Sequence, residues 1–162
     1  MLLAACASRP PVAADVATFI VVRHAEKVDA SRDPALGAAG HARARALAQR
    51  LDGTPLVAAY ATEFKRTGQT LAPTVQARGL ATTAYAASEP AAEFAARLRA
   101  AHPRGTVLVA GHSNTVPGIV AALCGCIVAP MPDHEYDRLS IIHVAADGPP
   151  RLAVERYGDP TP

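Results

Sequence analysis

The sequence predicts a three-layer α/β/α sandwich with a mostly parallel sheet and an antiparallel edge. Three observations support this fold class. Short apolar runs typical of buried strands alternate along the chain with segments of helical periodicity. The two clearest runs, 18–22 and 106–110, pass directly into polar residues, as strands do at the ligand-binding edge of a parallel sheet. The last two predicted strands, 138–145 and 152–157, are joined by a turn too short for a parallel crossover.

The composition narrows the function classes. A chain of 162 residues is long enough for one domain with a substantial core. It has three Phe, four Tyr and no Trp, which argues against a groove that stacks the bases of single-stranded nucleic acid. A formal net charge of +2 is too small to indicate a partner such as nucleic acid. Any attraction for anions must therefore come from local clusters of arginine.

The chain is expected to fold as one domain over 17–158, after a partial leader and tether at 1–16 and before a tail at 159–162. Residues 3–6, Leu-Ala-Ala-Cys, resemble the lipobox of bacterial lipoproteins, in which Cys6 would carry the lipid. The apolar stretch before Cys6 is too short for a complete signal peptide or a membrane span. Either the true signal starts earlier, or the match is chance in an Ala- and Leu-rich segment. The first alternative predicts a lipoprotein anchored at the periplasmic face of a bacterial membrane, and the second a cytoplasmic protein.

The strand at 18–22 is followed by a loop over 29–39 and then by a helix. The helix is predicted because four apolar residues recur with the spacing i, i+3, i+4, i+7: Ala44, Leu47, Ala48 and Leu51. Three arginines lie mostly off this stripe and are expected at the solvated surface: Arg43, Arg45 and Arg50. The helix should end at residues 53–55, because the proline there cannot continue it.

A second strand at 56–61 leads into a helix that reaches Val75 and contains Pro73, which indicates a kink or a late start. A third, weaker strand covers 82–85. The helix after it should begin near Ser88, a plausible N-cap, with Pro90 in its first turn.

The strand at 106–110 is followed by a helix from about Val116 to Leu123. Just beyond it lie Cys124 and Cys126, and cysteines this close in sequence rarely reach disulfide geometry. A metal site would need further ligands at ordered spacing, which are missing nearby. We therefore expect both cysteines to be small apolar fillers, and a metal carrier that also uses His134 is the alternative.

Three predicted strand ends carry side chains suited to an anion. The first strand ends at Arg23 and His24, the second leads to Arg66, and the strand at 106–110 leads to His112. If these strands are parallel neighbours, their carboxyl ends converge on one crevice. Like charges repel and must be desolvated, so such a group makes sense when a dianion completes it. Arginine binds phosphate oxygens in bidentate fashion, and a helix N-terminus after His112 adds N–H donors.

These segments resemble the signatures of the histidine phosphatase superfamily, which has the phosphoglycerate mutase-like fold, and within it the small single-domain branch. Residues 23–25, RHA, resemble its R-H-G/A signature. Residues 62–70, TEFKRTGQT, fit S/T-x-x-x-R-T-x-x-T, and residues 111–113, GHS, contain its G-H motif. Each signature alone is weak, but the three occur in the family's order, each where a strand should end.

The resemblance implies a phosphatase that needs no metal or other cofactor and acts on a small phosphomonoester or on phosphohistidine. His24 would be the nucleophile and would form a phosphohistidine intermediate. Arg23, Arg66 and His112 would bind the phosphoryl group, and Lys27 is a further candidate. Mutases of this fold carry insertions that exclude water, whereas the loops here are short. A phosphomutase is therefore a weaker alternative, as is a non-catalytic phosphoryl-binding lipoprotein.

The general acid is the least determined residue. It must protonate the leaving oxygen from the same edge of the sheet as His24. Glu89 is the first candidate, because family members often carry their acid between the second and third signatures. Glu135 and Asp137 precede a strand and are alternatives, and Glu26 is the remaining one.

Overall fold

The structure, a computed structural model, describes residues 16–162, along which strands and helices alternate as far as two consecutive strands at the C-terminal end. The predicted lipobox with Cys6 lies outside these residues. The elements are β1 (Val16–Arg23), α1 (Ala38–Arg50), β2 (Leu56–Thr62), α2 (Lys65–Gln76), β3 (Thr82–Tyr85), α3 (Ala91–Ala101), β4 (Gly105–Gly111), α4 (Val116–Cys124), β5 (Arg138–Ala145) and β6 (Arg151–Arg156). None of the described helices has the length and apolar character needed to cross a membrane.

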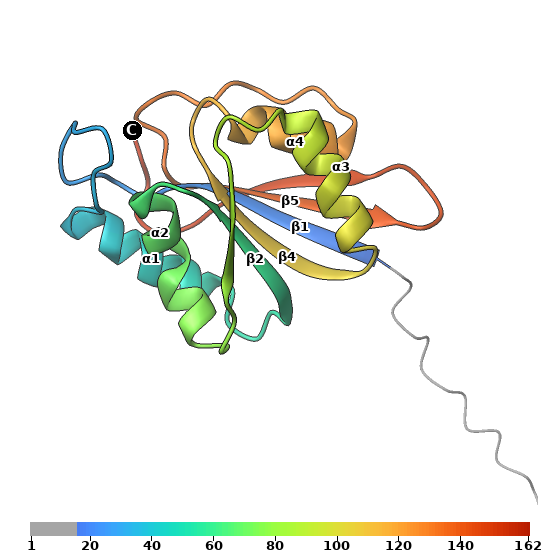
Figure 1. Cartoon of the computed structure of the whole chain (residues 1–162), viewed down its shortest axis with the longest axis horizontal. Coiled ribbons are helices and arrows are strands. Elements are labelled where there is room, and N and C mark those ends of the chain that lie inside the picture. The colour runs from blue at the N-terminus through green and yellow to red at the C-terminus, as the bar shows by residue number, and fades with distance from the viewer. Residues whose placement is uncertain (1–15) are drawn as a thin grey trace, which may run out of the picture.

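The strands form one mixed sheet in the order β3-β2-β4-β1-β5-β6. The first four of these strands are parallel to one another. β5 pairs with β1 in antiparallel fashion and β6 pairs with β5, which confirms the predicted antiparallel edge. Helices α1 and α2 cover one face of the sheet, and α3 and α4 cover the other (Figure 1). The predicted three-layer sandwich is therefore confirmed.

The central strands are apolar on both faces because each face has its own layer of helices. In β1, Phe19 and Val21 pack with the core under α3 and α4, while Ile20 and Val22 pack with the core under α1 and α2. Every residue from Phe19 to Arg23 is buried. This explains why the strand appears in the sequence as a continuous apolar run rather than an alternating one.

The parallel register of β1 and β4 sets the position of the site. Arg23 pairs with Gly111 at the carboxyl ends of the two strands. The His24 amide then donates to the Gly111 carbonyl at 2.8 Å, which extends the ladder by one bond. β2 lies on the other side of β4, so Thr62 also ends at this edge of the sheet. The three signature segments therefore lie side by side.

Two local expectations are wrong. The N-cap of α3 is Pro90 and not Ser88, so the helix begins after the proline. Arg43 is buried, with 5% of its surface exposed, and is not a solvated surface residue. Its guanidinium binds the Glu26 carboxylate through Nε at 2.9 Å and Nη2 at 2.7 Å, and Nη1 donates to the Tyr157 carbonyl at 2.9 Å. These three hydrogen bonds take the place of hydrogen bonds to water. Helical periodicity alone does not reveal such partners.

The expectation that Cys124 and Cys126 are unpaired apolar fillers is also wrong, because the two residues form a disulfide. Gly125 caps α4 in the left-handed region, with φ of 63°. This turn brings the two Cα atoms to 5.2 Å, within the usual disulfide range. The prediction from the spacing of the two cysteines did not consider a left-handed turn at the glycine between them.

The segment that follows β1 passes very close to the first turn of α1. A Cβ built on Gly40 would lie 2.2 Å from the carbonyl oxygen of Glu26. The same oxygen accepts a hydrogen bond from the Gly37 amide at 2.9 Å. Glycine at 40 therefore allows the backbone just beyond His24 to rest against the helix.

Replacing Gly40 with alanine should destabilise the fold, whereas alanine at Gly68 should not. Gly68 lies in α2, and a Cβ there would meet no atom within 4 Å. Gly40→Ala should lower the free energy of unfolding by about 1–3 kcal/mol through steric overlap. Gly68→Ala should leave it unchanged or raise it by up to about 1 kcal/mol through helix propensity. Urea unfolding measures both, and wild-type stability for Gly40→Ala would contradict this packing.

Candidate active site

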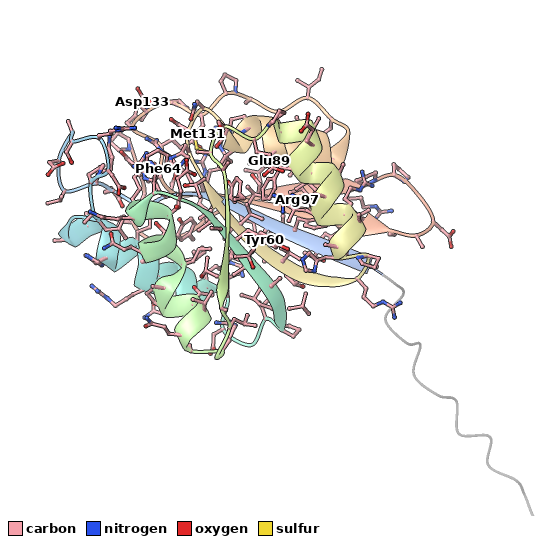
Figure 2. The ribbon with its side chains drawn as sticks, viewed as in Figure 1. Tyr60, Phe64, Glu89, Arg97, Met131 and Asp133 are labelled. Carbon is pink, nitrogen blue, oxygen red and sulfur yellow. A yellow bond between two sulfur atoms is a disulfide. The ribbon has the colours of Figure 1, made fainter. Side chains whose placement is uncertain are left out.

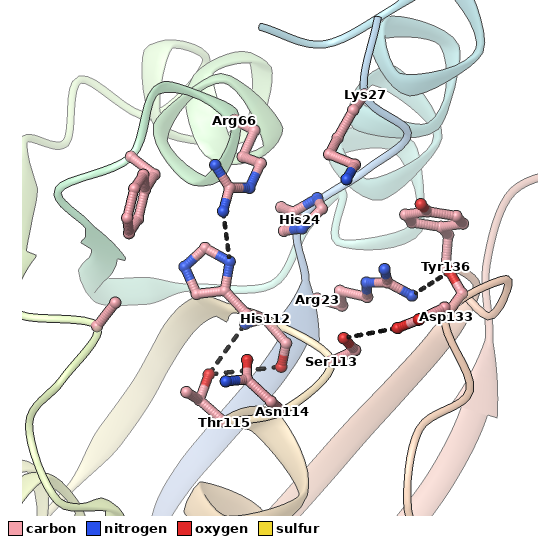
Figure 3. Close-up of a pocket in the computed structure, with 12 residues that line it drawn as sticks. Arg23, His24, Lys27, Arg66, His112, Ser113, Asn114, Thr115, Asp133 and Tyr136 are labelled. Carbon is pink, nitrogen blue, oxygen red and sulfur yellow. Dashed lines mark hydrogen bonds between the residues drawn. The ribbon is translucent and has the colours of Figure 1, made fainter. Parts of the chain in front are cut away.

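A cavity of about 510 Å³ opens where β1 and β4 end. Its lining includes the four residues at the cores of the three signatures: Arg23, His24, Arg66 and His112. Lys27 also lines it, from the loop after β1. Figure 3 shows the rings of His24 and His112 and the guanidinium of Arg66 around one space. The structure thus brings together all the predicted phosphate-binding residues.

His24 is held as a neutral imidazole with one free nitrogen. Its Nδ1 lies 2.8 Å from the Ala25 carbonyl oxygen, which can only accept, so Nδ1 carries the proton and Nε2 does not. Burial lowers the pKa of His24 from 6.5 to about 3. The hydrogen bond to Ala25 opposes this effect, and the positive charges of Arg23 and Arg66 add to it. At neutral pH, Nε2 therefore has the lone pair that a nucleophile needs.

His112 is fixed in the opposite tautomer. Nη2 of Arg66, which can only donate, lies 3.3 Å from its Nδ1. Its Nε2 therefore carries the proton and donates to the Thr62 hydroxyl at 2.9 Å. Burial and, to a lesser extent, the charge of Arg66 lower the pKa of His112 to about 4, while the charge of Glu63 opposes this shift. The ring centroids of His24 and His112 are 5.3 Å apart, so two neutral imidazoles share the pocket.

Arg23 is anchored by the loop between α4 and β5. Its Nη1 donates to three carbonyl oxygens, of Pro132 at 3.1 Å, Asp133 at 2.8 Å and Glu135 at 2.9 Å. The guanidinium carbon lies 4.1 Å from the ring centroid of Tyr136, in cation–π contact. Nε of Arg23 is buried without a hydrogen-bond partner. Burial lowers the pKa of Arg23, although the group stays charged at physiological pH.

Arg66 lies in the first turn of α2, and its guanidinium carbon is 4.5 Å from the ring centroid of Phe64. Both its Nε and its Nη1 are buried without a hydrogen-bond partner. Nη1 lies 3.9 Å from Oδ1 of Asp33, which is too far for a hydrogen bond. Buried charged donors without acceptors are costly, so this arrangement is suited to an anion that supplies acceptor oxygens.

Glu89, the first predicted general acid, does not line the cavity. Its carboxylate pairs with Arg97, at 2.6 Å from Nη2 and 3.1 Å from Nε. Figure 2 shows this pair beside α3, away from Phe64 and Asp133. The structure therefore places Glu89 in a surface ion pair.

Glu135 and Asp137 are equally engaged outside the cavity. Glu135 accepts from Arg138 Nη2 at 2.6 Å and from Arg156 Nη1 at 2.7 Å. Asp137 accepts from the same Nη1 of Arg156 at 2.7 Å and from the Thr161 hydroxyl at 2.8 Å. Hydrogen bonds from these arginines and from Thr161 outweigh burial and lower the pKa of both carboxyls. These carboxylates and Glu26, which binds Arg43, are thus committed to structural ion pairs.

The carboxylate found at the cavity was missed in the sequence. Asp133 lines the pocket from the loop between α4 and β5, as does Tyr136. No signature covers this loop, and no periodicity marks it. One signal was available in the sequence, the position of Asp133 shortly before the strand β5. Because β5 lies beside β1, the loop that leads into β5 must cross the edge of the sheet where β1 ends.

A metal centre is not formed by the described side chains. Among residues 16–162, no group of three or more His, Cys, Asp and Glu side chains is arranged to hold a metal ion. The disulfide also removes Cys124 and Cys126 as thiolate ligands. The metal carrier that would combine them with His134 therefore lacks its ligand set.

Comparison with known proteins identifies a family model for this fold. Residues 19–89 match the model of the histidine phosphatase superfamily, branch 1. The segment contains the first two signatures, with His24 and Arg66. The match confirms the predicted resemblance and the enzyme class that goes with it, a phosphatase. No curated protein sequence is significantly similar to this chain.

Solved structures share the fold over most of the chain. The protein histidine phosphatase SixA, complexed with tungstate, has a TM-score of 0.71 and 22% identity, and the alignment covers 86% of this chain and 96% of SixA. For a mycobacterial glucosyl-3-phosphoglycerate phosphatase the TM-score is 0.66 at 13% identity, with 88% and 98% covered. For a phosphoserine phosphatase from Entamoeba histolytica, complexed with 3-phosphoglyceric acid, it is 0.64 at 12% identity, with 89% and 98% covered. At these identities the likeness shows the fold.

Acid should destabilise the ligand-free protein through its buried imidazoles. The pKa of His24 is about 3 when folded and 6.5 ordinarily, so below pH 6.5 the unfolded chain binds more protons. The stability that His24 contributes is complete above pH 6.5 and is lost as the pH falls toward 3. Between about pH 7 and pH 5, His24→Asn should therefore lose less stability than the wild type, by up to about 2 kcal/mol.

Thermal or urea unfolding in buffers without oxyanions measures this difference. The matched control is His41→Asn, since His41 is exposed on α1. It should keep the wild-type dependence on pH. Parallel pH dependence for His24→Asn and the wild type would show that His24 is not buried as a neutral ring.

Proposed function

We propose that this protein, which resembles the histidine phosphatase superfamily over residues 19–89, hydrolyses a small phosphorylated substrate through a phosphohistidine on His24, without a metal ion. One observation supports this most strongly. Buried N–H donors of Arg23 and Arg66 lack partners beside an imidazole whose Nε2 is free. Such a group is ready for an oxyanion and for attack on it.

Binding uses the two guanidiniums. Nε and Nη1 of Arg66 and Nε of Arg23 donate to phosphoryl oxygens, which relieves their unsatisfied state. Lys27, which Figure 3 shows pointing toward His24, adds a further positive charge at the cavity. In the loose transition state of phosphoryl transfer, charge is spread over the equatorial oxygens. Fixed cations aimed at these oxygens lower the barrier without having to reorganise.

Transfer then uses the fixed tautomer of His24. The Nε2 lone pair forms a bond to phosphorus while the bond from phosphorus to the leaving atom breaks, and the electron pair goes to the leaving atom. Positive charge develops on the ring, and the Ala25 carbonyl, 2.8 Å from Nδ1, stabilises it. Water next attacks phosphorus, the N–P bond breaks, and its electron pair returns to Nε2. The product is inorganic phosphate.

The cavity and the structural neighbours support a small phosphoryl substrate. A space of about 510 Å³ holds a phosphoryl group and a modest leaving group. The neighbours include a phosphatase of protein histidine and a phosphatase of a sugar phosphoglycerate ester. Both a phosphomonoester and a phosphohistidine therefore remain within the proposal.

Replacing the nucleophile should abolish turnover of p-nitrophenyl phosphate. His24→Asn should reduce kcat by at least about 10³-fold, because no other imidazole nitrogen at the cavity is both neutral and free. Arg66→Ala should reduce kcat/KM by about 10²–10³-fold through loss of charge stabilisation. His41→Asn should match the wild type. Saturating chelator should leave wild-type turnover unchanged.

The acid lability of a phosphoryl group trapped on the protein tests whether the intermediate is a phosphohistidine. Protein quenched during turnover and kept at alkaline pH should carry a phosphoryl group that acid releases, and the peptide that carries it should contain His24. Tight phosphate binding without turnover would instead indicate a non-catalytic phosphoryl-binding protein. Turnover that persists in His24→Asn, or that a chelator removes, would contradict the mechanism.

A further inference from the structure

Asp133 is the one carboxylate among the described residues that line the cavity. It lies in the loop between α4 and β5 and is an exposed residue. The other candidate carboxylates hold arginines outside the cavity, as Glu89 holds Arg97. A carboxylate at this cavity repels a bound oxyanion and so weakens its binding. Its presence there is therefore better explained by a part in the reaction.

Two contacts tie Asp133 to the phosphate-binding residues. Its backbone carbonyl accepts from Arg23 Nη1 at 2.8 Å, so the residue sits against the guanidinium. Its Oδ1 accepts from the Ser113 hydroxyl at 3.4 Å, and Ser113 follows His112 directly. Figure 3 shows the carboxyl of Asp133 beside Ser113 at the rim of the space that His24 and His112 share.

Glu63 is the other carboxylate near the site that must be compared with Asp133. It precedes Phe64, and its charge raises the pKa of His112, so it is near the site. However, its Oε2 accepts from the Ala87 amide at 2.8 Å, and its side chain does not line the cavity. Asp133 has no backbone amide on its carboxylate in the structure, so its carboxyl is the better placed to bind a substrate atom.

From this position we propose that Asp133 is the general acid–base of the reaction; the inference rests on the proposed phosphatase function. In the first half, the carboxylic acid gives its proton to the substrate oxygen as the P–O bond breaks, so an alcohol leaves and a carboxylate remains. In the second half, the carboxylate takes a proton from the water that attacks the phosphohistidine. The acid is thereby restored, and atoms and charge balance over the cycle.

The charge of the substrate favours the acid form at the start. A dianionic phosphoryl group close to a carboxyl disfavours a second negative charge there, so the proton is held. Once the alcohol has left with that proton, the carboxylate is available as a base. The site therefore suits phosphate esters of poorly acidic alcohols, which need protonation to leave.

Leaving-group dependence tests the role. Phenyl phosphate and p-nitrophenyl phosphate have similar shapes, but phenolate is the more basic leaving group and needs protonation more. The value of kcat/KM reports the steps up to release of the phenol and is independent of hydrolysis of the phosphoenzyme. Asp133→Asn should lower kcat/KM for phenyl phosphate by about 10²-fold or more, but for p-nitrophenyl phosphate by less than about threefold.

Asp133→Asn keeps the backbone carbonyl that binds Arg23, so the anchor of the guanidinium is retained. Asp147→Asn, in the exposed turn between β5 and β6, is the matched control and should behave as the wild type with both substrates. Glu63→Gln tests the competing carboxylate and should affect both substrates equally.

Three results would overturn the assignment of Asp133. These are equal losses for the two substrates in Asp133→Asn, no loss for either, and a loss selective for phenyl phosphate in Glu63→Gln instead. Failure of the proposed function is distinguishable, because it would appear as absent wild-type turnover or as activity that survives in His24→Asn.

Discussion

The hydrogen bond from the His24 amide to the Gly111 carbonyl joins the ends of two parallel strands at 2.8 Å. It places the residue after β1 against the residue that opens the loop after β4, so the two histidine rings come to 5.3 Å. Because β2 lies on the other side of β4, Thr62 reaches the His112 ring, and Arg66 in the first turn of α2 reaches the same ring. The pocket is thus a consequence of strand order, and side chains that are far apart in sequence meet there without long loops.

Burial keeps both histidines of the pocket neutral, and this limits the repulsion among its four basic side chains. Two arginines and two histidines would repel one another if all were charged, but burial lowers the pKa of His24 to about 3 and that of His112 to about 4. Only the guanidiniums remain positive, and each is partly supported, Arg23 by backbone carbonyls and Arg66 by His112. The donors left over are those without a partner inside the protein. The site therefore holds a neutral imidazole with a free Nε2 beside cations whose buried donors lack partners.

The sequence predicted the fold class because it depends on local patterns. For the same reason it predicted that four residues meet at one edge of the sheet: Arg23, His24, Arg66 and His112. Apolar runs such as 106–110 and the polar residues after them reveal strand ends, and three such ends imply one crevice. It did not predict the burial of Arg43, the disulfide at Cys124, or the carboxylate at the pocket. The burial of Arg43 and the place of the carboxylate depend on contacts made across the fold, and the disulfide depends on the left-handed turn at Gly125. Glu89 has the position along the chain that an acid would need, yet Arg97 lies close enough to pair with it. Asp133 belongs to a loop whose path is set by β5 pairing with β1.

A crystal structure of the protein with tungstate tests the central claim most directly, since this oxyanion mimics a phosphoryl group. We expect tungsten within bonding distance of His24 Nε2. Its oxygens should contact Nε and Nη1 of Arg66 and Nε of Arg23, the donors that now lack partners. Tungstate bound elsewhere, or at the pocket with His24 Nε2 turned away from it, would contradict the account.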